Sequence, residues 1–106
     1  QDTFKTRRVT DEELLAKVHT VYQEHDHVID PHTAVGLVAA ENRVGDAPLV
    51  ALATAHPCKF QMAVCKSLGD EFWRTEMPLH YPPSMPALLS APEIQRGVFE
   101  AGQDWE

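Results

Sequence analysis

A single short run of apolar residues, LVALA at residues 49–53, limits what this chain can fold into more than any other feature. The run lies between two predicted helices and carries no polar residue on either face, which is typical of a strand buried in a parallel sheet. We find no second strand that could pair with it. A buried strand without a neighbour would leave amides and carbonyls unpaired, at about 1–3 kcal/mol for each group. We therefore expect the partner strands to come from another polypeptide or from a longer chain.

Two helix starts are visible in the first half of the chain. Thr10 and Glu13 form a capping box, and an apolar stripe at helical spacing follows them. Asp30 is a good N-cap, and Pro31 suits the first position of a helix, where its missing amide costs nothing. The second helix is apolar on every side, which predicts that it is buried, and Gly36 predicts a close approach by another backbone.

A third helix is predicted to begin at Pro57 and to end before Gly69. Beyond it, we expect residues 70–106 to form an irregular proline-rich tail, because the prolines among residues 76–92 exclude long regular elements. One short helical turn is expected near Leu88. The predicted fold class is α/β, with helices packed on one or few parallel strands in a sheet that is incomplete on its own.

The overall charge narrows the classes of partner. A formal net charge of −7 argues against nucleic acid and anionic membranes, because both require a basic surface. No apolar run is long enough to cross a bilayer, so we expect a soluble, cytoplasmic protein. Cys58 and Cys65 form no C-x-x-C pair, which disfavours a redox or zinc site built on them.

Two longer motifs carry a resemblance to a known family. The motifs DPHTAVG (residues 30–36) and LATAHPCKF (residues 52–60) follow a capped helix, in the order and separation found in the C-terminal part of threonine synthase. Across residues 9–68 the chain resembles that family, and most closely its members that are not activated by S-adenosylmethionine. These are pyridoxal-phosphate enzymes of fold type II. The chain is accordingly identified as a C-terminal fragment of their catalytic domain.

The resemblance implies a reaction and its participants. Threonine synthases convert O-phospho-L-homoserine and water to L-threonine and phosphate with pyridoxal 5'-phosphate as cofactor. The cofactor lysine and the phosphate cradle lie in upstream segments that this chain lacks, so the remainder of the enzyme is an implied partner and the fragment alone is expected to be inactive. The chain has four lysines, Lys5, Lys17, Lys59 and Lys66. None of them lies in the family's Schiff-base motif, so no catalytic residue is assigned.

The resemblance also implies a cofactor contact. In this family the threonine of the TAHP motif, here Thr54, contacts the pyridine nitrogen, and His56 would position Thr54 or line the pocket. A neutral hydroxyl need not keep that nitrogen protonated, so the cofactor becomes a weaker electron sink. The alternative for Thr54 is an ordinary hydroxyl at the end of a strand, and the alternative for His56 is a structural histidine in a turn.

Three residues are predicted near the substrate phosphate: His32, Thr33 and Lys59. Helix N-termini attract anions, which favours the first two, but a plain helix cap and a solvent-facing lysine are open alternatives. A metal site built from His25, His27 and His32 is disfavoured, because their spacing matches no zinc signature.

Two other functions remain open. One is a threonine-synthase-like phospho-lyase that releases a 2-oxo acid from the same substrate. The other is a non-catalytic binding module, derived from the enzyme, that docks a partner on its exposed sheet edge.

Overall fold

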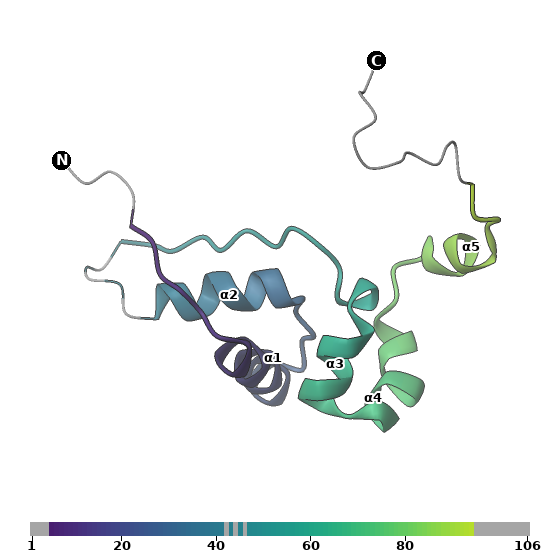
Figure 1. The fold of residues 1–106 in the computed structure, drawn as a ribbon, viewed down its shortest axis with the longest axis horizontal. Coiled ribbons are helices and arrows are strands. Elements are labelled where there is room, and N and C mark those ends of the chain that lie inside the picture. The colour runs from purple at the N-terminus through teal and green to yellow at the C-terminus, as the bar shows by residue number, and fades with distance from the viewer. Residues whose placement is uncertain (1–4, 42, 44, 46, 95–106) are drawn as a thin grey trace, which may run out of the picture.

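The computed structural model describes residues 5–41, 43, 45 and 47–94, and within these the chain is helical (Figure 1). The α-helices are α1 (Asp11–His25), α2 (Pro31–Ala40), α3 (Gln61–Leu68), α4 (Asp70–Thr75) and α5 (Met85–Ser90). Two 3-10 helices, η1 (Pro57–Lys59) and η2 (Met77–His80), precede α3 and follow α4. No described residue is in a β-strand.

The predicted capping box begins α1. The Thr10 hydroxyl accepts a hydrogen bond from the Glu13 amide at 3.3 Å, and the Glu13 carboxylate accepts one from the Thr10 amide at 2.8 Å. At the other end, Asp26 adopts a left-handed conformation with φ of 51°, and its amide donates to the Tyr22 carbonyl. The start of α1 is therefore as predicted, and its end is a left-handed cap that was not predicted.

Helix α2 begins as predicted, with Asp30 as its N-cap and Pro31 in the first turn. Its burial is narrower than expected, because the buried side chains are confined to one face: Thr33, Ala34 and Val38. The close approach expected at Gly36 is wrong for the described chain, since a Cβ at that position would meet nothing within 4 Å.

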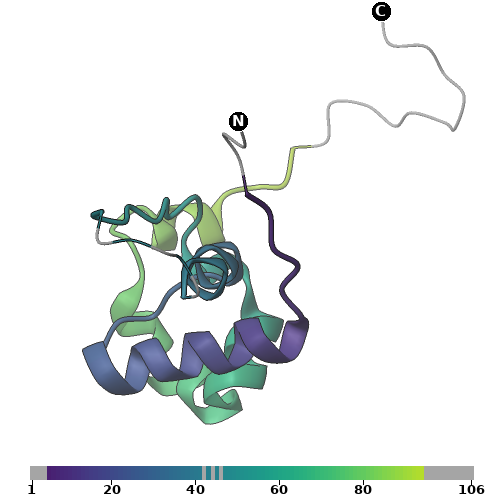
Figure 2. The same ribbon diagram turned by 90° about the vertical axis from the view of Figure 1, so that its left-hand side faces the viewer.

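Two apolar clusters hold the helices together. Helix α1 packs against both α2 and α3, and α3 packs against α4. Figures 1 and 2 show α1 and α2 crossing far from parallel, since each is seen end-on in the view where the other lies lengthwise. Val18, Ile29 and Ala34 form the cluster between α1 and α2. The second cluster joins η1, α3, α4, η2 and α5 to the segment after α1, through Val28, Cys58, Val64, Phe72, Met77 and Met85.

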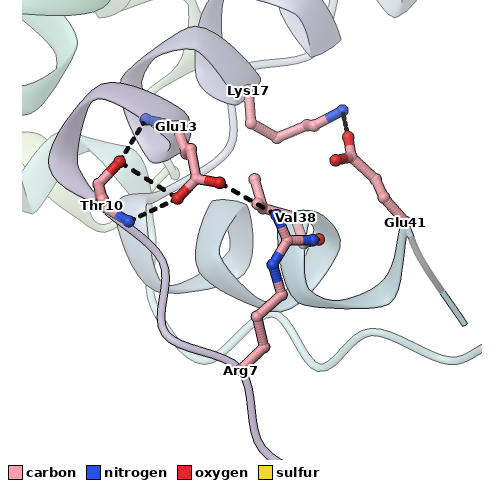
Figure 3. Close-up of polar contacts among 6 residues, drawn as sticks. All are labelled: Arg7, Thr10, Glu13, Lys17, Val38 and Glu41. Carbon is pink, nitrogen blue, oxygen red and sulfur yellow. Dashed lines mark hydrogen bonds and ion pairs between the residues drawn. The ribbon is translucent and has the colours of Figure 1, made fainter.

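A polar network reinforces the contact between α1 and α2 (Figure 3). The Arg7 guanidinium donates to the Val38 carbonyl near the end of α2 and, at 3.0 Å, to the Glu13 carboxylate on α1. One turn further along α1, the Lys17 ammonium pairs with the Glu41 carboxylate, which follows α2. The segment before α1 is thereby tied to the far end of α2.

The strand predicted at residues 49–53 is wrong for this chain on its own. The segment has no regular secondary structure, and its side chains are exposed, with Val50 at 82% and Leu52 at 77%. The physical reason is the missing neighbour: a strand is defined by hydrogen bonds to an adjacent strand, and the described residues supply none. The α/β fold class is therefore not reproduced, and the described chain is helical.

The region after Gly69 is more ordered than expected. Helix α4 and η2 occupy residues where an irregular tail was predicted, and they are held in place by the buried side chains of Phe72 and Met77. Helix α5 confirms the short helical turn near Leu88. Residues 95–106 of the predicted tail lie outside the described residues. No helix among the described residues is long and apolar enough to cross a membrane.

Candidate functional site

The turn that begins α2 is built around the carboxylate of Asp30, which is 1% exposed. One oxygen, Oδ1, accepts hydrogen bonds from the His32 amide at 2.9 Å and the Thr33 amide at 3.4 Å. The other oxygen, Oδ2, accepts from the Thr33 hydroxyl. The donors at this helix N-terminus are therefore already used within the chain, including the hydroxyl predicted to lie near a substrate phosphate.

These hydrogen bonds decide the charge of Asp30. Burial raises the pKa of the carboxyl, but the hydrogen bonds from the side chains and amides of Thr33 and His32 outweigh burial and hold the pKa below its ordinary value. Asp30 is consequently a buried but ionised carboxylate at neutral pH. A charge of this kind is stable only while all of its donors stay in place.

The side chain of His32 takes part in the same turn. Its Nδ1 lies 3.0 Å from Asp30 Oδ1, although 63% of the side chain is exposed. Its ring also meets the ring of Phe60 edge-on, with the ring centres 5.1 Å apart and the planes at 63°. Phe60 belongs to the TAHPCKF motif, so this contact joins the two motifs, which lie far apart in the sequence.

A surface cavity of about 800 Å³ lies beside this junction. Pro31, Lys59 and Phe60 line it at the motifs, and side chains of α1 and α3 complete its walls. Most of the lining is apolar, and its charged residues are Lys59, Lys66 and Asp11. The two lysines outnumber the one carboxylate, so the cavity suits a small ligand with an anionic group, since apolar walls with a few charged groups are typical of ligand sites.

The one cysteine that lines this cavity, Cys65, is a poor nucleophile. Burial and the neighbouring Asp70 carboxylate both raise the pKa of its thiol, so it stays protonated at neutral pH. Both cysteines, Cys58 and Cys65, are free thiols. Elsewhere too, the described residues contain no group of three or more His, Cys, Asp or Glu side chains that could hold a metal ion.

The predicted cofactor contact, Thr54, is not among the residues that line this cavity. It follows the apolar segment 49–53 and is exposed, and no hydrogen bond of its hydroxyl is found within the described chain. His56 instead caps η1, where its Nδ1 accepts a hydrogen bond from the Cys58 amide at 3.2 Å. His56 thus has a role in this turn, while its predicted role in the cofactor pocket stays a prediction, and the Thr54 hydroxyl is left available.

Two partnerships were missed in the sequence. The hydrogen bond between the Asp30 carboxylate and the His32 ring could have been found from the Asp-x-His spacing, because a capping aspartate lies next to the second residue of its helix. The ring contact between His32 and Phe60 had no such signal, because 28 positions separate the two residues and they meet only through the packing of both α2 and α3 against α1.

Comparison with known proteins gives one consistent family. A sequence model described as "Threonine synthase, C-terminal" matches residues 33–104, which include the TAHPCKF motif. The chain is 41% identical over 66 residues to threonine synthase from Pseudomonas aeruginosa, which covers 60% of this chain and 14% of that protein. It is 38% identical over 76 residues to threonine synthase from Eremothecium gossypii, covering 63% of this chain and 15% of that protein.

Relatives with a second name also match. The chain is 34% identical over 70 residues to "Threonine synthase-like 1" from Mus musculus, covering 65% of this chain and 9% of that protein. No solved structure matches the chain. In every one of these alignments, the chain spans a small part of its relative, at most 15% of the relative's length.

Proposed function

This chain belongs to the threonine synthase C-terminal family, and on that premise we propose that it is the segment of a threonine synthase that brings Thr54 to the pyridine nitrogen of pyridoxal 5'-phosphate. The complete enzyme would convert O-phospho-L-homoserine and water to L-threonine and phosphate. The observation that carries the proposal is the family match across the TAHPCKF motif, together with an exposed Thr54 hydroxyl at the end of an apolar segment.

The cofactor would act as an electron sink, and the residue facing its ring nitrogen tunes that capacity. A hydroxyl is neutral and can donate or accept, so Thr54 fits an unprotonated ring nitrogen better than a carboxylate would. Its position after an apolar segment also suits a ligand contact, because ligands of open α/β sheets bind beyond the carboxyl ends of the strands.

The apolar segment 49–53 would become a strand once the remainder of the enzyme is present. Its side chains are apolar on both faces and exposed in this chain, so burial between helices of a parallel sheet would stabilise it. Amide hydrogen exchange tests this step. We expect rapid exchange at residues 49–53 in the isolated chain and strong protection in the complete enzyme, whereas rapid exchange in both would contradict the strand.

For the substrate phosphate, Lys59 is the favoured contact among the three predicted residues. Its side chain is exposed, it lines the cavity beside the two motifs, and no ion pair of its ammonium group is found among the described residues. Thr33 already donates its hydroxyl to Asp30, so a phosphate there would have to displace an internal bond. Lys59→Gln in the complete enzyme should raise KM for the phosphorylated substrate more than it lowers kcat.

The central experiment removes the Thr54 hydroxyl and keeps the side chain's shape. In the complete enzyme, Thr54→Val should keep the fold, shift the absorbance of the bound cofactor and lower turnover. Thr54→Ser, which restores the hydroxyl, should recover both. Thr75→Val is the matched control, because Thr75 is an exposed threonine on α4 whose hydroxyl bonds its own helix. Cofactor spectra and rates identical to wild type in Thr54→Val would remove the assignment.

The phospho-lyase remains a second candidate function, because the match to the family does not fix the reaction, and relatives with the separate name "Threonine synthase-like 1" match this chain as well. Product analysis on O-phosphohomoserine separates the two reactions. Threonine supports the synthase, and 2-oxobutyrate supports the phospho-lyase.

A further inference from the structure

His32 differs from the chain's other histidines in its hydrogen bonding. Its Nδ1 lies 3.0 Å from a carboxylate oxygen of Asp30. An ionised carboxylate can only accept a hydrogen bond, so Nδ1 of His32 must carry the proton. The neutral ring then holds its free lone pair on Nε2, the nitrogen that faces away from Asp30.

His56 shows the opposite arrangement and serves as an internal reference. Its Nδ1 accepts a hydrogen bond from the Cys58 amide at 3.2 Å, so that nitrogen must be unprotonated. The neutral ring of His56 therefore carries its proton on Nε2 and has no free lone pair to offer. The two motifs thus present two histidines in opposite tautomers, each fixed by a local partner.

The ring of His32 is also held in place while remaining accessible. Asp30 fixes one edge of the ring, and the edge-on contact with Phe60 restricts its rotation. The side chain is nevertheless 63% exposed. His32 does not itself line the cavity, but it adjoins the cavity's edge, because its neighbours Pro31 and Phe60 are lining residues. A carboxylate, an oriented imidazole and an accessible second nitrogen are the parts of a general base.

We propose that Asp30 and His32 form a proton-accepting pair, in which Nε2 of His32 takes a proton from an O–H or N–H group of a small ligand in the adjacent cavity. The proton leaves the ligand oxygen or nitrogen, which keeps the electron pair, and the ring becomes an imidazolium. Asp30 stays a carboxylate and compensates the new charge, so it is a positioning residue. The ligand class is a small molecule with an anionic group, because Lys59 and Lys66 line the same cavity and outnumber its one acidic lining residue, Asp11.

The pair itself can be tested in the chain alone, independently of any enzyme. Ring-nitrogen chemical shifts of a chain labelled in its histidines, measured at mildly alkaline pH, should show His32 protonated on Nδ1 and His56 protonated on Nε2. Asp30→Asn should shift His32 toward the mixture of tautomers found in free imidazole. Asparagine caps helices as well as aspartate does, so this variant keeps α2. A wild-type His32 protonated on Nε2 would overturn the pair.

Chemical reactivity gives a second readout. Diethyl pyrocarbonate attacks an unprotonated, accessible ring nitrogen, so His32 should react several-fold faster than His56 in the wild-type chain. Asp30→Asn should reduce the rate at His32 and leave His56 unchanged. Equal rates at the two histidines in the wild-type chain would contradict an accessible lone pair on His32.

The catalytic use of the pair rests on the proposed function and is tested in the complete enzyme. His32→Ala should lower kcat by roughly 100-fold or more, the usual contribution of a general base, with the cofactor absorbance unchanged. Added imidazole should restore part of the rate, which a purely structural role would not allow. No loss of rate, or a loss that imidazole cannot repair, overturns the catalytic use. A failure of the proposed function would be recognised separately, because the cofactor spectrum of Thr54→Val would then be identical to that of the wild type.

Discussion

Two short segments of this chain behave differently in the structure. In the capped turn, residues 30–33, Asp30 and Thr33 are buried, and the Asp30 carboxylate is hydrogen-bonded to His32 and Thr33, its neighbours in sequence. The apolar segment, residues 49–53, is exposed throughout and forms no regular structure. The difference lies in the range of the interactions that each needs. A cap is completed by its own neighbours in sequence, whereas a strand requires a second strand from elsewhere.

The largest expected effect follows from removing the centre of the capped turn. Asp30→Ala deletes the cap and leaves the buried Thr33 hydroxyl without its acceptor, which should lower the free energy of unfolding by about 2–3 kcal/mol. Asp30→Asn keeps a capping oxygen, so it should cost about 1 kcal/mol. Urea unfolding followed by circular dichroism measures both. Equal losses in the two variants would show that charge alone, and not the cap, stabilises the turn.

The same carboxylate makes stability depend on pH. The folded chain lowers the pKa of Asp30, and hydrogen bonds from the Thr10 amide and hydroxyl lower the pKa of Glu13. A lowered pKa stabilises the fold at pH values above the unfolded pKa, near 4, and this stabilisation is lost as pH falls through the folded pKa. Thermal unfolding from about pH 6 down to pH 3 should therefore show declining stability. Asp30→Asn should make that decline shallower. If stability falls as steeply in Asp30→Asn as in the wild type, Asp30 is not the group responsible for the decline.

A smaller effect is expected at the capping box of α1. Thr10→Ala removes the acceptor of the Glu13 amide and should cost about 1 kcal/mol, while Thr10→Ser keeps the oxygen and should cost little. Comparison of the two variants by thermal unfolding isolates the hydroxyl. A loss well above this figure would show that the network with Arg7 depends on Thr10 as well.

The smallest effect is expected in the apolar segment. Leu52 is 77% exposed, so Leu52→Ser should change the stability of the isolated chain by less than about 0.5 kcal/mol. The same substitution in the complete enzyme should be strongly destabilising if the segment is a buried strand there. Equally small effects in the isolated chain and in the complete enzyme would show that residues 49–53 do not form a buried strand in either.

The accuracy of the sequence predictions follows the same division. The starts of α1 and α2 were predicted correctly, because Thr10, Glu13, Asp30 and Pro31 act on residues within one turn. The turn at Leu88 was also correct. Helix α4 was missed because it is six residues long and is held by the buried Phe72 ring, which also meets Tyr22 of α1 at 4.8 Å between ring centres.

The candidate site divides likewise. The motifs pointed to three residues near the substrate phosphate: His32, Thr33 and Lys59. In the structure, His32 contacts Phe60, the residue next to Lys59. The cofactor role of Thr54 stays a prediction, and the turn role of His56 emerges from its bond to the Cys58 amide.

By itself, the sequence determined the starts of α1 and α2, the aspartate that caps α2 and the family to which the chain belongs. Each depends on residues close together in the chain, or on a motif that can be compared directly with relatives. Only the tertiary structure decided that two distant motifs meet at His32 and Phe60 beside a cavity, and that an apolar segment can stay exposed. Both outcomes depend on which surfaces pack together in three dimensions, and this cannot be predicted from the spacing of residues along the chain.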